Sequence, residues 1–456
     1  MGNDKRSLSS PWRRASGVAL DGARLIRASW RSMRRTSPWQ HVHPRALGAL
    51  LRERRNPSVG SLFAFYAANA PHQTALLFGD ERYRYRDLDR AARAIATALH
   101  EGHGLRSHDT VLLALGNVPE HLVLHGALGM IGATVATVSY RSTAVELRHL
   151  LEDSGAKAVF TAPSLGPALE EAMTAAVRAR IAERVFVVRG QFTGAIPYAS
   201  LLRTTPRPIA PPDERQKVVI YTSGTTGKPK GAVRSVEVRG LERAVSSALP
   251  AAGFFAHVPL GFGRTHLAVC PLYHSTGLGF TLIALALGSR ILLHERFEPE
   301  RVYRDLARHD VAHTAMVPTM LHRLLEAVDE GTIRAERPAR SLEAIFCGGA
   351  PLSPSLSQRV LDAFGPCLFN FYGATETALV ALAGPDDLRR APGTIGRPIV
   401  GNDVRLLDEE GREVAEGEVG ELWVKTGNRI DTYLNNPGAM REASRLGYLS
   451  VGDLAR

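Results

Sequence analysis

Short apolar runs and stretches of helical period alternate along the chain from about residue 58 onward. Short runs rich in β-branched residues are typical of buried strands, whereas apolar residues recurring every three or four positions are typical of helices. Their alternation predicts βαβ units around a mainly parallel sheet, hence an α/β fold. The expected strands are residues 111–115, 134–138, 158–161, 184–188, 218–222, 267–270, 290–293, 313–317, 342–347 and 367–371. The expected helices are residues 87–100, 120–130, 145–151, 299–309, 318–327 and 353–363.

The pattern changes after residue 393. Short alternating runs at 403–407, 413–415 and 421–425 surround turn residues at 408–411. This arrangement predicts a small, largely antiparallel β-subdomain. Near the end of the chain, Gly452 and Asp453 form a further turn-like pair.

The length of 456 residues exceeds the size at which one hydrophobic core stops growing, so more than one packed lobe is expected. A Pro-rich stretch at 205–212 is interpreted as a surface linker that separates two α/β layers. We therefore expect a basic arm at 1–55, an α/β domain at 56–392 and the β-subdomain at 393–456.

Most of the net charge of +11 lies in the arm, where residues 1–55 hold 13 Lys and Arg against 3 Asp and Glu. Wound as a helix, residues 18–35 separate an apolar face from an arginine face, which suits the surface of an anionic membrane. A solvated arm or a transit peptide fits the same residues. The rest of the chain is close to neutral, so nucleic acid is not an expected partner.

Three cysteines, Cys270, Cys347 and Cys367, have no Cys or His neighbours at the spacings of zinc ligands or disulfide scaffolds. No run of 18 apolar residues is present that could span a membrane. We expect a cytoplasmic protein, either free or peripheral at the inner face of the membrane.

The segment YTSGTTGKPKGA at 221–232 follows a predicted strand and is dense in phosphate-binding groups. Glycines let backbone N–H groups turn inward around an anion, hydroxyls add donors, and lysines neutralise phosphate charge. It is not a Walker loop, because Pro229 follows Lys228 where that loop requires Ser or Thr. A Gly/Thr-rich hairpin or lid without a ligand is the alternative.

Four further motifs follow in order: PLYHSTG at 271–277, CGGAPLS at 347–353, FYGATET at 371–377 and GYLSVGD at 447–453. With the loop, they make the chain resemble the adenylate-forming superfamily of acyl-CoA synthetases, luciferases and peptide-synthetase adenylation domains. The resemblance implies the large N-terminal domain of that fold, with mixed, mainly parallel sheets, flanking helices and a small β-subdomain. It also implies ATP, Mg²⁺ and CoA as cofactors and co-substrates.

The resemblance implies a role for each motif. The loop would wrap the β- and γ-phosphates, Glu376 and Thr222 would hold magnesium, and Thr375 would face the α-phosphate. His274 would lie beside the reacting carboxylate or be structural. The implied catalytic residues are His274, Lys230, Thr375 and Glu376.

Adenine would stack on Tyr372, with Ala350 and Pro351 on its other side and Asn370 near its amino group. Asp453 would accept the ribose hydroxyls. The implied nucleotide-binding residues are Thr222, Ser223, Gly224, Thr225, Thr226, Gly227, Lys228, Lys230, Ala350, Pro351, Asn370, Tyr372, Thr375 and Asp453.

In this family a carboxylate attacks the α-phosphorus of ATP and the acyl-AMP is then captured by a thiol, usually that of CoA. A carboxylic acid is already ionised near neutral pH, so the first step needs charge neutralisation and positioning rather than a base. Phrases such as ALALGSRILLHERFEPE resemble bacterial fatty acyl-CoA synthetases, which predicts a medium or long acyl chain. Its wall would be formed by the helix after Gly277, by 316–320 and by 348–349, although these residues fit a core equally well.

Members of the family continue beyond the Gly-Asp turn with a small C-terminal lid that carries a catalytic lysine. Because this chain ends at Arg456, we expect that it binds ATP and acid but turns over poorly. The alternatives are an acyl-AMP ligase that feeds a carrier protein and an inactive ATP- or acyl-binding fragment.

Overall fold

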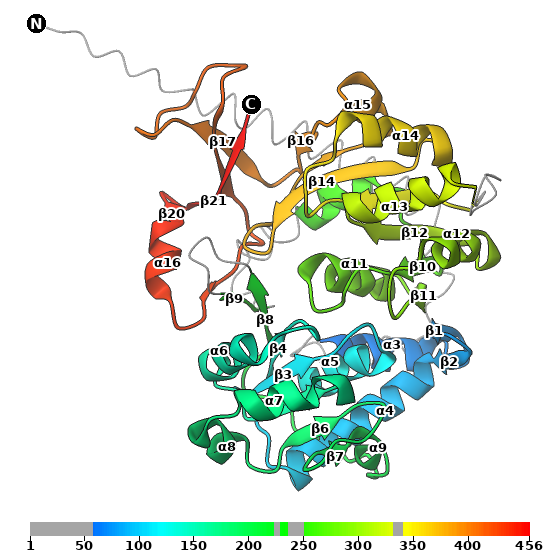
Figure 1. Ribbon diagram of the computed structural model, residues 1–456, viewed down its shortest axis with the longest axis vertical. Coiled ribbons are helices and arrows are strands. Elements are labelled where there is room, and N and C mark those ends of the chain that lie inside the picture. The colour runs from blue at the N-terminus through cyan, green and yellow to red at the C-terminus, as the bar shows by residue number, and fades with distance from the viewer. Residues whose placement is uncertain (1–57, 223–228, 236–249, 332–340) are drawn as a thin grey trace, which may run out of the picture.

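The computed structural model describes residues 58–222, 229–235, 250–331 and 341–456, arranged as two large sheets, a small sheet and their covering helices (Figure 1). The basic arm, including the membrane-binding helix predicted at 18–35, lies outside the described residues. Within the described residues, no helix is long and apolar enough to cross a membrane.

An eight-stranded sheet forms one lobe, with strand order β19-β9-β8-β4-β3-β5-β6-β7. Its strands from β8 to β7 run parallel, and β9 and β19 are added antiparallel at one edge. The strands are β3 Thr110–Ala114, β4 Thr134–Thr137, β5 Ala158–Thr161, β6 Val185–Val187, β7 Ile196–Pro197, β8 Lys217–Thr222, β9 Lys230–Ser235 and β19 Thr432–Tyr433. The associated helices are α5 Pro119–Ile131, α6 Ala144–Ser154, α7 Gly166–Ala172, α8 Ala175–Ile181 and α9 Tyr198–Leu201.

The stretch 205–212 does not separate two layers, contrary to our prediction. Strand β8, which follows it, pairs in parallel with β4, which precedes it, so both belong to one sheet. The stretch instead carries the chain from β7 at one edge of this sheet to β8 near the other.

A nine-stranded sheet forms the second lobe, in the order β16-β15-β14-β13-β12-β10-β11-β1-β2. Its central strands are parallel, and antiparallel strands flank them on both sides. The strands are β1 Thr74–Phe78, β2 Glu81–Arg84, β10 Thr265–Ala268, β11 Arg290–Leu293, β12 Val311–Met316, β13 Ala344–Cys347, β14 Leu368–Ala374, β15 Ala378–Ala383 and β16 Arg397–Pro398. The associated helices are α11 Ser275–Ala286, α12 Pro299–Arg308, α13 Pro318–Asp329, α14 Pro354–Phe364 and α15 Pro385–Arg390.

The predicted β-subdomain is a four-stranded sheet in the order β17-β18-β21-β20, made of β17 Asp403–Leu407, β18 Gly420–Lys425, β20 Ser444–Arg445 and β21 Tyr448–Ala455. Helix α16, Pro437–Glu442, precedes β20. Residues 413–415 do not form the predicted strand, because only Glu413 makes a bridge, to Leu407. The turn-like Gly452 lies inside β21, where its φ of +84° accompanies a shift in the pairing with β18.

The two large sheets share one hydrophobic core. Helices α3, Val59–Asn69, and α4, Tyr85–Thr97, belong to it together with α5 and with buried residues of β10, β11 and α11. Hydroxyls of Tyr66 and Tyr85 donate to the carbonyls of Ala286 (2.7 Å) and Ser289 (3.2 Å) in the other lobe. The lobes are therefore joined by both apolar packing and buried hydrogen bonds.

Asn117, which follows β3, makes several hydrogen bonds between the two lobes. Its amide donates to the carbonyls of Cys270 and His294, both at 3.1 Å, and its side-chain oxygen accepts from the N–H of Leu272 at 2.8 Å. The side chain is only 3% exposed. It fixes the loop that carries Tyr273 and His274.

We expect Asn117→Ala to lower the free energy of unfolding by about 2–4 kcal/mol, because it leaves buried backbone groups without partners. Urea unfolding followed by circular dichroism measures the change. Gln358→Ala, which removes an exposed hydrogen bond to Asp362 on α14, is the matched control and should change stability by less than about 0.5 kcal/mol. Equal effects of the two substitutions would contradict the role of Asn117.

Buried histidines make the stability of the fold depend on pH. Burial lowers the pKa of His121 and of His313 to about 4. The unfolded chain takes up these protons below about pH 6.5, whereas the folded protein does not. Protonation therefore favours unfolding, and stability is lost as the pH falls from about 6.5 toward 4.

We expect His121→Gln to reduce the slope of unfolding free energy against pH by up to about 1.4 kcal/mol per pH unit between about pH 6 and pH 5. Urea unfolding at several pH values measures both slopes. Identical slopes for the substituted and unmodified proteins would show that His121 is already protonated in the folded state.

Candidate active site

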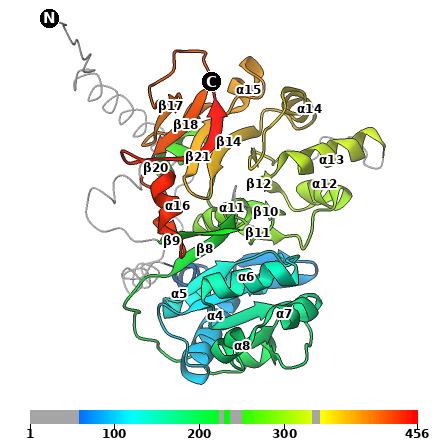
Figure 2. The ribbon, with the colours of Figure 1, turned by 60° about the vertical axis from the view of Figure 1, so that its left-hand side comes forward.

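Three of the residues predicted for the site, Thr222, Lys230 and Glu376, meet between the β8–β9 edge of the eight-stranded sheet and the segment that follows β14. Figure 2 shows these strands and the small sheet. Thr222 ends β8 and Lys230 begins β9, and the two residues pair directly across the antiparallel ladder. Ser223, Gly224, Thr225, Thr226, Gly227 and Lys228 lie outside the described residues. The sheet thus brings together the two ends of the phosphate loop.

Glu376 lies next to this loop although it follows a strand of the other sheet. Its side chain is only 7% exposed, and its Oε1 accepts hydrogen bonds from the hydroxyls of Tyr433 (3.0 Å) and Thr222 (3.3 Å). Within the described part of the chain, no donor contacts Oε2. Among the described residues, the carboxylate is therefore held through Oε1 alone.

Lys230 places its ammonium near Tyr433, the tyrosine that donates to Glu376. Its ammonium lies 5.8 Å from the ring centre of Tyr433, and no described carboxylate forms an ion pair with it. An ammonium in this state can neutralise an incoming phosphate.

Thr375 is fixed through both its backbone and its side chain. Its carbonyl accepts a hydrogen bond from Arg234 at 2.8 Å, and its hydroxyl lies 3.2 Å from that of Ser275 at the start of α11. Arg234 also donates to the carbonyl of Asn428. Burial lowers the pKa of Arg234, while Asp431 and Glu376 oppose that shift.

His274 is the N-terminal cap of α11 and packs against the ring of Tyr273, with ring centres 4.4 Å apart. Its backbone N–H donates to the carbonyl of Pro271 at 3.1 Å, whereas its imidazole makes no hydrogen bond with any described residue. Desolvation by the surrounding protein lowers the pKa of its imidazole, so the ring is neutral near pH 7. A neutral ring can lie beside a carboxylate as a hydrogen-bond donor, but it adds no positive charge.

Tyr372 and Asp453, which the sequence placed on different parts of the nucleotide, contact each other. The Tyr372 hydroxyl donates to Oδ2 of Asp453 at 2.7 Å. Asn370 donates through its amide to the carbonyl of Thr394 at 2.8 Å, so its oxygen remains available as an acceptor. An acceptor is what the amino group of adenine requires.

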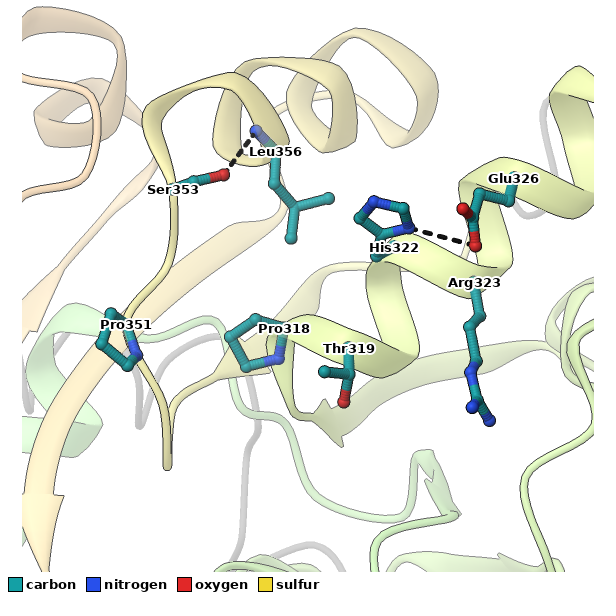
Figure 3. A pocket seen from close by; sticks show the side chains of 8 residues that line it. All are labelled: Pro318, Thr319, His322, Arg323, Glu326, Pro351, Ser353 and Leu356. Atoms are coloured by element: carbon teal, nitrogen blue, oxygen red, sulfur yellow. Dashed lines mark hydrogen bonds and ion pairs between the residues drawn. The ribbon is translucent and has the colours of Figure 1, made fainter.

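Ala350 and Pro351 are exposed on the segment between β13 and α14. Pro351 borders a pocket of about 330 Å³ between the first turns of α13 and α14 (Figure 3). Its other lining residues are Pro318, Thr319, His322, Arg323, Glu326, Ser353 and Leu356. Among the described residues, Pro351 is the one predicted nucleotide-binding residue that lines this pocket, and Pro318 and Thr319 belong to the acyl-chain wall predicted at 316–320.

Gly348 does not leave room for an acyl chain as the sequence suggested. A Cβ atom at this position would lie 2.5 Å from the ring of Phe371 and 2.7 Å from its carbonyl oxygen. Glycine is required here because Phe371 fills the space. At Gly349 the nearest atom to such a Cβ, on Val317, is 3.7 Å away.

Three residues of the site were missed by the sequence analysis: Arg234, Ser275 and Tyr433. Ser275 stands inside a motif that was recognised, so its position was a usable signal. Arg234 and Tyr433 lie on strands β9 and β19, and nothing in their local sequence marks them as neighbours of Glu376.

Thr222 and Lys230, at the two ends of the loop sequence, lie with the buried carboxylate of Glu376 at the junction of two α/β sheets, which fits the adenylate-forming class of enzymes. Residues 63–434 match the AMP-binding enzyme family, and the chain belongs to that family. It is an acid–CoA ligase of the AMP-forming type.

Relatives act on different acids. The chain is 30% identical to a feruloyl-CoA synthase from Amycolatopsis over 88% of its own length and 76% of that protein. It is 28% identical to a long-chain-fatty-acid–CoA ligase from Yersinia pestis, with 91% and 78% covered. The acid is therefore not settled by these relatives.

Solved structures agree with the fold. The O-succinylbenzoate CoA synthetase of Bacillus subtilis in complex with AMP superimposes with a TM-score of 0.70 at 25% identity, covering 86% of this chain and 75% of that one. The N-terminal domain of FACL13 from Mycobacterium tuberculosis gives 0.74 at 23% identity, covering 87% and 96%. The predicted fold class is confirmed.

ATP, Mg²⁺ and CoA are the cofactors and co-substrates of this class. The residues present fit a magnesium ion, which prefers oxygen ligands. Oε2 of Glu376 has no donor among the described residues, and the Thr222 hydroxyl donates to Oε1 but keeps lone pairs with which it could bind a cation. No group of three His, Cys, Asp or Glu side chains in the described ranges could hold a metal by itself. Such a sparse protein ligand set suits Mg²⁺ that arrives with ATP phosphates.

Proposed function

We propose that this chain activates a medium or long-chain fatty acid as its acyl-adenylate and transfers the acyl group to CoA. The observation that carries the proposal is the convergence of Thr222, Lys230 and Glu376 at the mouth of the phosphate loop. Lys230 would neutralise phosphate charge. Glu376 and Thr222 would hold the magnesium ion, which when bound would offset charge on the phosphates.

The remaining residues would position the reactants. Thr375 would donate to the α-phosphate, and neutral His274 would lie beside the reacting carboxylate. Tyr372, with Ala350 and Pro351, would enclose adenine, while Asn370 would accept from its amino group. Asp453 would accept from the ribose through Oδ1, because Oδ2 is already bonded to Tyr372.

An apolar cluster that includes Phe280 of α11 is the reason for proposing a fatty acid as the substrate. Phe280 on this helix packs against Phe346 and Phe371, with ring centres 4.7 and 5.2 Å apart, and Ile283 lies at the border of the same cluster. The cluster also contains Phe254, Val258, Leu260 and Phe369. A second carboxylate, as in succinylbenzoate, would be left there without a partner, at a high desolvation cost.

A carrier protein is the second candidate for the acyl acceptor. It is favoured by a relative named fatty acid–[acyl-carrier-protein] ligase from Streptomyces coeruleorubidus, which is 29% identical over 86% of this chain and 73% of that protein. Acyl-AMP consumption with CoA or with a phosphopantetheine-bearing carrier protein separates the two acceptors. If acyl-AMP is consumed faster with the carrier protein than with CoA, the carrier protein is the acyl acceptor.

We expect the chain to bind ATP in the presence of Mg²⁺, and Lys230→Ala and Glu376→Gln each to weaken that binding by about tenfold or more, since each removes a charge-assisted contact. Isothermal calorimetry measures both affinities. Lys217→Ala is the matched control, because Lys217 lies at the opposite end of the β8–β9 ladder and pairs with Glu214. No ATP affinity in the unmodified chain would falsify the proposed site.

We expect acyl-sulfamoyl-adenosines, stable analogues of acyl-adenylates, to bind more tightly as an alkyl chain lengthens, by up to about 0.8 kcal/mol per buried CH₂. Calorimetry across a ladder from acetyl to palmitoyl, with feruloyl and succinylbenzoyl analogues beside it, gives the ranking. A tighter aryl analogue than every alkyl one would reject the fatty acid.

A further inference from the structure

Tyr433 lies behind the proposed magnesium and phosphate site, on a strand of only two residues. Strand β19 pairs with β9 through Thr432–Val233 and Tyr433–Ala232, and the N–H of Leu434 donates to the carbonyl of Gly231 at 2.8 Å. The side chain of Tyr433 is only 8% exposed. Its backbone is therefore tied to the strand that leaves the phosphate loop.

The hydroxyl of Tyr433 contacts the side chain of Glu376. It donates to Oε1 at 3.0 Å, and the N–H of Ile430, three residues earlier, donates to the Glu376 carbonyl at 2.8 Å. The segment 430–433 thus holds Glu376 by its backbone and by its side chain. Since Thr222 also donates to Oε1, the oxygen left for a cation is Oε2.

The ring of Tyr433 contacts the second charged group of the site. The ammonium of Lys230 lies 5.8 Å from the ring centre, within the range of a cation–π interaction. One side chain therefore contacts both charged groups of the proposed site, Glu376 through its hydroxyl and Lys230 through its ring.

We propose that Tyr433 is a positioning residue for the ATP–magnesium site, with its hydroxyl aiming Glu376 Oε2 at the cation and its ring orienting the Lys230 ammonium. This inference rests on the proposed role of Glu376 as a magnesium ligand. Hydrogen bonds to a ligating carboxylate orient it, and their loss typically costs tenfold to a hundredfold in metal affinity. Because Tyr433 also contacts Lys230, the same side chain would position the carboxylate that binds the cation and the ammonium that binds the phosphates.

A purely structural tyrosine would make a different prediction. Tyr433 also packs with Ala232, Ile430 and Ala439 in a small apolar cluster, and in that role only the ring would matter. Tyr433→Phe keeps the ring and removes the hydroxyl, so it separates packing from the orientation of Glu376.

We expect Tyr433→Phe to raise the Mg²⁺ concentration required for half-maximal ATP binding by about tenfold. ATP binding measured in EDTA should stay unchanged, because the ring and the Lys230 contact remain. Calorimetry with ATP and MgCl₂ on the full chain supplies both values, and thermal unfolding confirms that the variant is folded.

Tyr221→Phe is the matched control. Tyr221 lies on β8, and its hydroxyl donates to Asp153 at 2.9 Å, so the substitution removes the same kind of tyrosine–carboxylate bond away from Glu376. Its Mg²⁺ dependence should coincide with that of the unmodified chain. In a Glu376→Gln background, Tyr433→Phe should produce no further shift, because the ligand it orients is gone.

Two outcomes would overturn the inference, and they differ in what else they imply. If Glu376→Gln shifts the Mg²⁺ dependence and Tyr433→Phe does not, Tyr433 does not orient the ligand and the proposed function stands. If neither substitution shifts it, Glu376 is not the magnesium ligand and the proposed site fails with the inference. Should Tyr433→Phe not fold, Tyr433→Met takes its place in the same measurement, because methionine also lacks the hydroxyl and keeps an apolar side chain in the cluster.

Discussion

The buried carboxylate of Glu376 is the constraint around which this end of the molecule is organised. A carboxylate removed from water needs hydrogen-bond donors, and those it has come from β8 through Thr222 and from β19 through Tyr433. Its own backbone follows β14 of the other sheet. The hydrogen bonds of Glu376 therefore require strands of both large sheets to lie close together. They do so beside Thr222 and Lys230, the two ends of the phosphate loop.

The charges around this carboxylate explain why the site suits anionic substrates. Lys230 is unpaired within the described residues, and Arg234 is used to hold the backbone of Thr375 rather than to contact a ligand. His274 contributes no charge near pH 7, because desolvation lowers its pKa. In the proposed function, activation of an ionised acid needs neutralisation and alignment, and these residues would supply both without a general base.

The same junction depends on the contact between the lobes. Asn117 of one lobe bonds backbone groups on both sides of Pro271, directly before Tyr273 and His274. The start of α11, which positions Ser275 against Thr375, is thereby tied to the end of β3. The hydrogen bonds of Asn117 therefore contribute both to the contact between the lobes and to the position of the segment that begins α11.

The local pattern was sufficient for several elements that apolar residues define, although it missed the apolar strands β1 and β15 and helix α3. Strands 158–161, 290–293 and 403–407 were predicted with the bounds that the structure has, and each predicted helix overlaps an observed one. The pattern failed for β2, with its sequence ERYR, and for β9, with KGAVRS, because these strands lie at or near sheet edges and alternate poorly. The strand at 413–415 was wrong because only one residue bridges its neighbour.

The sequence by itself determined the α/β class and the family to which the chain belongs, since these depend on residue types at short spacings. Only the tertiary structure decided which residues share the site. Thr222 lies 154 positions from Glu376, and Tyr433 lies 57 positions away. Contacts over such separations depend on strand order and register, and the local alternation of apolar and polar residues does not encode which distant strands become neighbours.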